Sequence, residues 1–140
     1  MTLYVLDTDH LTLFRYGHAA VTARVDATPA DQLATTIVTI EEQLTGWYTL
    51  LRKCKRQREI VVAYEQLAES VLFLSTLPIF AFSDGAAEIM AELRKQKIRI
   101  STLDLRIASI ALANDAVVVT RNLQHFSKVP GLQIEDWSAT

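Results

Sequence analysis

The sequence has little of what disulfide-rich, thiolate-binding or membrane proteins require. Its 140 residues include one cysteine, Cys54, which excludes an internal disulfide framework and a zinc or redox site built from paired cysteines. Four glycines and three prolines are too few for a collagen-like or low-complexity chain. The longest uncharged stretch, residues 70–83, has 14 residues and contains Pro78, so it is too short to cross a bilayer.

Charge of neither sign dominates. Lys and Arg number 14 and Asp and Glu number 16, which gives a net charge of −2 at pH 7. This balance argues against a protein that bulk positive charge holds on nucleic acid. The first residues, MTLYVLDTD, lack the basic region that begins a signal peptide. We therefore expect a cytoplasmic protein with no membrane partner.

The remaining composition is that of a globular protein with one core. Half of the residues are hydrophobic and 21% are charged, and the length predicts a single domain over residues 1–140. Short apolar runs predict buried strands at residues 3–6, 34–38, 79–82 and 116–120 and an edge strand at 132–134. Apolar stripes predict helices at residues 8–16, 19–27, 39–51, 59–77, 84–97 and 103–113. Alternating strands and helices predict an α/β fold with a mainly parallel sheet.

Acidic and amide side chains follow these strands or begin these helices. They are Asp7, Asp9, Glu41, Glu42, Asp104 and Asn122. Because sites in open parallel sheets form beyond the carboxyl ends of the strands, we expect these groups to meet at one edge. Converging carboxylates raise each other's pKa, and a divalent cation relieves the repulsion. All-oxygen ligands suit Mg²⁺ or Mn²⁺ rather than zinc, and such a cation serves phosphate chemistry.

Each of these residues also has a simpler interpretation as a helix cap. The matching patterns are Thr39-x-x-Glu42, Ser101-x-x-Asp104, Asp7 or Asp9, and Asn122. Capping does not require acids to converge at one edge, whereas a metal site does. Gly46 lies one turn beyond Glu42 and leaves that helical face open, which favours Glu42 over Glu41 as a ligand.

Four segments of the chain together resemble the PIN-domain family, and within it the VapC-type toxins of bacterial toxin–antitoxin pairs. The segments are LDTD at 6–9, IEEQLTG at 40–46, STLDLRIASIALA at 101–113 and VTRNLQHFSKVPGLQIEDW at 119–137. They cover nearly the whole chain in family order, and the ending VPGLQIEDW is particularly VapC-like. The resemblance implies a three-layer α/β/α, Rossmann-like fold with a mainly parallel sheet of four to five strands.

The resemblance also implies an Mg²⁺- or Mn²⁺-dependent endoribonuclease that cleaves RNA, forms a homodimer and is neutralised by a VapB-type antitoxin. By position, Asp7, Glu42 and Asp104 are the core acidic residues, which we expect to hold the cation. Asn122 stands where many members carry a fourth acid, and Asp9 stands where Asn or Ser is common. We expect these two in a supporting role, Asn122 through a water molecule.

Two other functions stay open. Asp7-Thr8-Asp9 after an apolar strand resembles the DxD of haloacid-dehalogenase-like phosphatases, with Asp7 as the nucleophile. Leu11, and Asn122 in place of an acidic pair, depart from that family's pattern. The second alternative is a PIN-like module that binds RNA or a partner with weak or no catalysis. Its only support is the Asn at position 122.

The other conspicuous residues are expected to be structural. The three histidines, His10, His18 and His125, lack the spacing of metal ligands and are expected at the surface or as caps. The apolar residues within 60–82 exceed what one helix needs to reach a core. We expect them to pack against a second subunit or the antitoxin.

Overall fold

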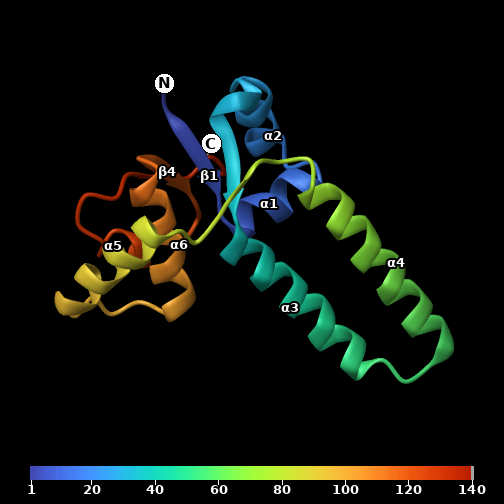
Figure 1. The fold of residues 1–140 in the computed structure, drawn as a ribbon. Coiled ribbons are helices and arrows are strands. Elements are labelled where there is room, and N and C mark those ends of the chain that lie inside the picture. The colour runs from blue at the N-terminus through green and yellow to red at the C-terminus, as the bar shows by residue number, and fades with distance from the viewer. Residues whose placement is uncertain (140) are drawn as a thin grey trace.

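Five short strands form the centre of the computed structural model, which describes residues 1–139 (Figure 1). They are β1 (Leu3–Leu6), β2 (Leu33–Thr36), β3 (Ile79–Phe80), β4 (Ala116–Val119) and β5 (Ile134–Glu135). Their order across the sheet is β3-β2-β1-β4-β5, and every neighbouring pair is parallel. The predicted α/β fold with a mainly parallel sheet is confirmed.

Helices lie on both faces of this sheet. Within residues 1–139 they are α1 (Thr8–Arg15), α2 (Ala19–Asp26), the 3₁₀ helix η1 (Ala30–Gln32), α3 (Ile37–Lys53), α4 (Gln57–Leu74), α5 (Asp84–Lys95), α6 (Thr102–Ala113) and α7 (Leu123–Phe126). The core on one face draws on α5, α6 and α7, and the core on the other draws on α1, α2 and the end of α4. The three-layer α/β/α architecture is therefore confirmed.

Neighbouring residues of the central strands point to opposite faces of the sheet. In β1, Val5 packs in the core beneath α5 and α6, and Leu6 packs in the core beneath α1 and α2. In β4, Val118 and Val119 divide in the same way. Because side chains alternate along a strand, a fully apolar run is buried on both sides of a parallel sheet.

Strand β2 gives way to α3 earlier than predicted. The hydroxyl of Thr36 accepts a hydrogen bond from the backbone N of Thr39 at 3.0 Å, so it caps a helix that begins at Ile37. Thr39 lies inside that helix, with its own hydroxyl 2.9 Å from that of Thr36. The predicted capping box of Thr39 and Glu42 is therefore wrong, and Glu42 has no capping role there.

Helix α5 begins at Asp84, as predicted, and α4 ends earlier than predicted. The hydroxyl of Ser83 caps α5 by accepting from the backbone N of Ala86 at 3.1 Å. A side chain placed just before the first helical residue reaches the exposed amides of the first turn, as Ser83 does. Helix α4 ends at Leu74, three residues before the predicted end. The chain then turns into Pro78 and β3.

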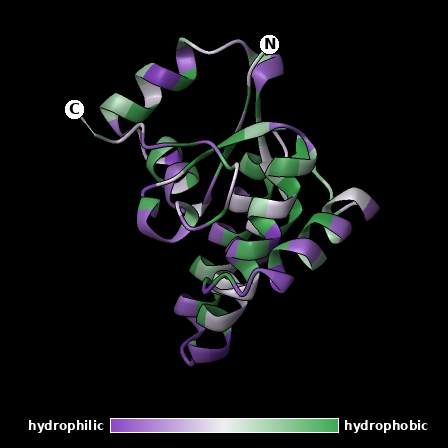
Figure 2. Ribbon diagram, turned by 90° about the vertical axis from the view of Figure 1, so that its left-hand side faces the viewer, coloured by the Kyte–Doolittle hydropathy of each residue, from purple (hydrophilic) through white to green (hydrophobic). Residues whose placement is uncertain are grey.

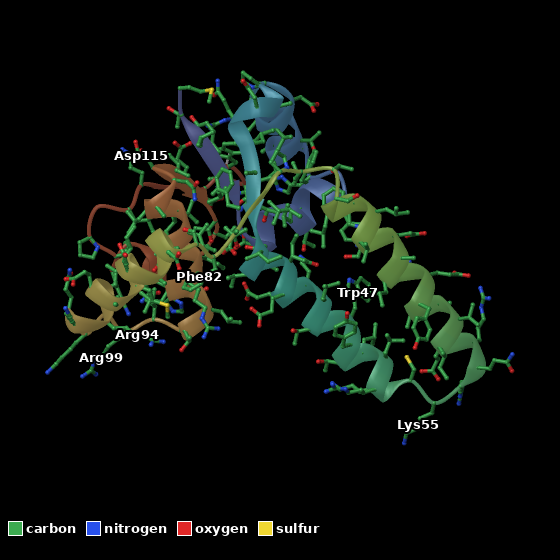
Figure 3. All side chains as sticks on the ribbon, viewed as in Figure 1. Trp47, Lys55, Phe82, Arg94, Arg99 and Asp115 are labelled. Carbon is green, nitrogen blue, oxygen red and sulfur yellow. The ribbon has the colours of Figure 1, made fainter. Side chains whose placement is uncertain are left out.

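Helices α3 and α4 form an antiparallel arm that projects from the sheet (Figure 1). Trp47 lies on the side of α3 that faces α4 (Figure 3). The tip of the arm is formed by residues 52–58, most of which are basic, and it is the hydrophilic lowest part of the molecule in Figure 2. The large apolar side chains exposed on α4 are Ile60, Val61, Val62, Tyr64, Val71 and Leu72. No helix in the described part of the chain is long and apolar enough to span a membrane.

Replacing Thr22 of α2 by Val should stabilise the protein. Among the described residues, the Thr22 hydroxyl is buried without a hydrogen-bond partner, and burying such a hydroxyl costs roughly 1–3 kcal/mol. Val has nearly the same shape, so the free energy of unfolding, measured in urea, should rise by about 1 kcal/mol. In the control Thr28→Val, a hydroxyl bonded to the carbonyl of Arg24 at 2.6 Å is removed, and no gain is expected. Unchanged or lower stability of Thr22→Val would contradict the prediction.

Candidate metal centre

The carboxyl ends of β1 and β4 lie side by side at one edge of the sheet. The chain places β2 on one side of β1 and β4 on the other, so the strand order reverses between β1 and β4. Ligand sites of open α/β sheets form at such a point. The backbone N of Asp7 donates to the carbonyl of Val119 at 2.9 Å, which extends the pairing of the two strands and sets Asp7 beside Thr120.

Asp7 is buried, with 7% of its surface exposed, and both of its carboxylate oxygens have partners. Oδ1 accepts from the backbone N of Thr8 at 2.8 Å, which caps α1, and Oδ2 accepts from the hydroxyl of Thr120 at 3.0 Å. Burial raises the pKa of Asp7 to about 6 although these hydrogen bonds lower it, and the negative charges of Asp9 and Asp104 raise it further.

The side chain of Glu42, on α3, lies near Asp7 and Thr8. Its Oε1 accepts from the hydroxyl of Thr8 at 3.4 Å. Partial burial raises the pKa of Glu42 to about 7, together with the negative charges of Asp7 and Asp104. Glu41 is exposed and lines a separate hollow. The structure therefore places Glu42, and not Glu41, beside Asp7.

The face of α3 that leads to Glu42 is open, as predicted from Gly46. A side-chain carbon at Gly46 would meet no other atom within 4 Å. Thr8, Glu42, Gly46 and Trp47 are among the residues that line a groove of about 340 Å³. A ligand can therefore approach Glu42 along this face.

Asp104 brings the third carboxylate from the first turn of α6. The predicted cap at Ser101 is confirmed, because its hydroxyl accepts from the backbone N of Asp104 at 3.1 Å. This bond involves the backbone N of Asp104, so the Asp104 carboxylate takes no part in capping α6. The Asp104 side chain is 17% exposed, and its charge contributes to the raised pKa values of Asp7 and Glu42.

Asn122 is linked to Asp104 through His125. The side-chain Nδ2 of Asn122 lies 2.9 Å from Nδ1 of His125, which lies 3.7 Å from Oδ2 of Asp104. The Asn122 side chain makes no capping bond to α7, so the alternative that it caps this helix is wrong. Its backbone N donates to the Thr120 hydroxyl at 3.0 Å. His125 is exposed, as predicted.

Thr120 was expected only as the end of a strand and was not among the residues predicted for the site. Thr120 is fully buried, donates to Asp7 and accepts from the backbone of Asn122. A hydroxyl directly after β4, at the edge where the acids gather, was the signal available in the sequence.

The prediction that His10 lies at the surface or caps a helix is wrong. His10 is fully buried, and its Nδ1 lies 2.7 Å from Oδ1 of Asp9. It sits one helical turn before Leu13 and Phe14, on the side of α1 that faces a core. That spacing was visible in the sequence. His18, in contrast, caps α2 as predicted, accepting from the backbone N of Val21 at 3.3 Å.

The three acids Asp7, Glu42 and Asp104 fit a hard divalent cation by their chemistry. All their donor atoms are oxygens. Burial, together with the negative charges of neighbouring acids, raises the pKa values of Asp7 and Glu42. Among residues 1–139, no three His, Cys, Asp or Glu side chains already converge on one metal position. Mg²⁺ usually keeps several water ligands and binds through one or two carboxylates. Such a cation therefore does not require all three carboxylates to touch it.

The sequence of residues 4–132 matches the family model described as PIN domain. This match covers most of the chain. The chain belongs to the PIN domain family. It is also similar to Ribonuclease VapC2 of Rickettsia felis, with 39% identity over 70 residues, and to the tRNA(fMet)-specific endonuclease VapC of Salmonella typhimurium, with 38% identity over 69 residues.

These two alignments cover 47% and 46% of this PIN domain, and the chain spans about half the length of the relatives, 52% of each. Similarity of structure extends further. The crystal structure of DNA-bound VapBC from Salmonella typhimurium contains a chain with a TM-score of 0.73 and 26% sequence identity, with 98% of this chain and 99% of that chain covered. Membership of this family removes the basis for the DxD phosphatase alternative.

Proposed function

We propose that this PIN domain is a metal-dependent endoribonuclease, the toxin component of a type II toxin–antitoxin pair. The observation that carries the proposal is that Asp7 and Glu42, from separate elements, both have raised pKa values to which the charge of Asp104 contributes, at the edge where the strand order reverses. Relatives named as a ribonuclease and as a tRNA endonuclease support RNA as the substrate.

Asp7, Glu42 and Asp104 are the proposed ligands of Mg²⁺ or Mn²⁺. When bound, such a cation supplies Lewis acidity for hydrolysis of a phosphodiester and offsets the charge of the phosphate. Thr8 and Thr120 hold the two oxygens of Asp7 through hydrogen bonds, so this carboxylate is oriented before RNA binds.

We place Asp9 and Asn122 outside the direct ligands. Both oxygens of Asp9 already have protein partners, His10 on Oδ1 and the backbone N of Arg121 on Oδ2. Asn122 contacts His125, which in turn lies beside Asp104. Both residues therefore support the site, and Asp9 is poorly placed to act as a general base.

The proposal is tested by incubating the purified protein with total RNA and purified tRNA in Mn²⁺ or EDTA. We expect cleavage only with the cation, and at least about a 100-fold loss in Asp104→Asn, because removing a ligand forfeits several kcal/mol of transition-state stabilisation. Asp115→Asn is the matched control: it removes the same charge at the opposite end of the sheet (Figure 3). Asp115 has a φ of 53°, which Asn also tolerates. Cleavage that survives EDTA or the Asp104 change would contradict the proposal.

A binding module without catalysis is the second candidate, because Asn122 pairs with His125 rather than supplying a fourth carboxylate. Titration with Mn²⁺ separates the two functions. If Mn²⁺ does not bind the wild type with an affinity that depends on Asp7, the binding module replaces the nuclease.

We further propose that the exposed apolar face of α4 is covered in the cytoplasm by a second copy of the chain and by a VapB-type antitoxin. The support is the set of large apolar side chains exposed on α4, from 37% exposed at Ile60 to 69% at Leu72. Light scattering of the purified protein should give the mass of two chains. The mass of one chain would refute the homodimer.

A further inference from the structure

A hydrogen-bonded connection, buried at His10 and Trp137, runs from the segment after β5 to the candidate metal centre. The backbone N of Trp137 donates to Nε2 of His10 at 3.0 Å, and Nδ1 of His10 lies 2.7 Å from Oδ1 of Asp9. Oδ2 of Asp9 accepts from the backbone N of Arg121 at 3.0 Å. His10 is 0% exposed and Trp137 is 2% exposed. The adjacent side chains of Asp9 and His10 on α1 therefore hydrogen-bond both to the segment after β5 and to the loop after β4.

The hydrogen-bond partners fix which ring nitrogen of His10 carries the proton. A backbone N–H only donates, so Nε2 of His10 presents its lone pair to Trp137, and Nδ1 carries the proton that is donated to Asp9. The carboxylate of Asp136 lies 3.4 Å from Nε2, but its Oδ1 accepts from the backbone N and the hydroxyl of Ser138 at 2.8 and 2.6 Å. The ring is therefore held from both sides.

Asp9, oriented by His10, in turn contacts the loop after β4, which carries Thr120 and Asn122. Its Oδ2 holds the backbone N of Arg121 and lies 3.4 Å from the Thr120 hydroxyl. The same hydroxyl donates to Oδ2 of Asp7 and accepts from the backbone N of Asn122. The position of Thr120 against Asp7 thus depends on how Asp9 is oriented.

We infer that His10 is a positioning residue of the nuclease site, which orients Asp9 so that Asp9 fixes residues 120–122 against Asp7. The inference rests on the proposed function. Without a donor on Oδ1, the Asp9 carboxylate is free to turn, and its charge already acts on Asp7. Loss of a hydrogen-bonding partner that orients metal ligands typically costs about 10–100-fold in activity or metal affinity.

Two substitutions of His10 separate its two hydrogen bonds. In Asn, the amide nitrogen is as many bonds from Cβ as Nδ1 of His, so His10→Asn keeps a donor for Asp9 and loses the acceptor for Trp137. In Gln, the amide oxygen is as many bonds from Cβ as Nε2, so His10→Gln keeps the acceptor for Trp137 and loses the donor for Asp9. If His10 served only to anchor β5, His10→Gln would be the milder change.

We expect the opposite order. With saturating Mn²⁺, kcat for RNA cleavage should fall about 10-fold or more in His10→Gln with KM unchanged, whereas His10→Asn should rescue most of it. In ¹⁵N–¹H spectra of the cation-free protein, the Arg121 amide resonance should move in His10→Gln and stay near its wild-type position in His10→Asn. In the wild type, the ring ¹⁵N shifts of His10 should show a protonated Nδ1 and an unprotonated Nε2.

Three results would overturn the inference: a protonated Nε2 in the wild type, equal kcat losses in the two variants, or an unshifted Arg121 amide in His10→Gln. The wild-type ring spectrum needs no variant, so poor folding of a variant does not block the test. If the wild-type protein cleaves no RNA, the proposed function fails. The Arg121 amide and ring spectra still report whether His10 positions Asp9.

Discussion

Asp7→Asn should cleave RNA at least about 100-fold more slowly than the wild type, and yet unfold at a higher temperature at pH 8 in EDTA. The loss of activity follows from the proposed role of Asp7 as a cation ligand, since an amide lacks the charge that holds Mg²⁺. The gain in stability follows from burial. At pH 8 the wild type must keep an ionised carboxylate at a position that is only 7% exposed.

The size of the gain follows from the pKa of Asp7, raised from 3.8 to about 6. Such a shift corresponds to an upper limit of about 3 kcal/mol. Asn keeps an oxygen for the backbone N of Thr8, but it offers an amide where Oδ2 accepted from Thr120. We therefore expect a net gain of about 1–2 kcal/mol in the free energy of unfolding.

Thermal unfolding at pH 8 and the RNA assay measure both effects on the same preparation. Asp115→Asn, at the far end of the sheet, should change neither by a comparable amount. A variant that is inactive because it is misfolded would be less stable than the wild type, so lower stability of Asp7→Asn would contradict the expectation. So would retained cleavage.

In EDTA, the free energy of unfolding of the wild type should fall as the pH rises from about 4 to 7. Both Asp7 and Glu42 have folded-state pKa values above their ordinary values, about 6 against 3.8 and about 7 against 4.5. Between these limits the folded state binds more protons than the unfolded state, so each unit of pH removes stability. Their contribution is fully present below pH 4 and lost above pH 7. The fall amounts to about 2–3 kcal/mol, because the two shifts partly share one cause and Glu42 is only partly buried.

Adding Mn²⁺ should remove or reverse this fall, because a cation that binds only the folded state stabilises it and offsets the repulsion among the acids. Urea unfolding at several pH values, with and without Mn²⁺, gives the comparison. Glu42→Gln should flatten the profile in EDTA, whereas Glu41→Gln should change it far less, since Glu41 is exposed on the same helix and its charge is the smallest contribution to the raised pKa of Glu42. A profile that rises between pH 4 and 7 in EDTA would show that the acids are not coupled as described.

The sequence was sufficient for the strands and for the edge at which the acids gather. Apolar runs such as residues 3–6 and 116–120 make strands wherever they can be buried on both faces. Parallel strands necessarily bring the residues after them to one edge, which is why Asp7 and Thr120 meet. Glu42 was preferred over Glu41 because Gly46 leaves one face of the helix open, and the structure places Glu42 beside Asp7.

The cap of α3 and the hydrogen bonds of His10 could not be predicted, because they depend on contacts between residues far apart in the sequence. Thr36 and Thr39 both suit a helix cap, and only the pairing of β2 with its neighbours decides which of them stands at the helix start. His10 was expected at the surface or as a cap because the three histidines lack the spacing of metal ligands. The backbone N of Trp137, which holds its ring, lies 127 residues away in the sequence. No spacing rule within α1 predicts that contact.

The pairing of β1 with β4 has a consequence for the order of events during protein synthesis. Asp7 leaves the ribosome early, but the hydroxyl that holds its Oδ2 belongs to a residue 113 positions later. Long-range pairing of this kind forms only when both segments are available, and it is slow because a long loop must close. A nascent chain therefore carries Asp7 without the partner strand that orients it. The proposed nuclease can act only after most of its own chain has been translated.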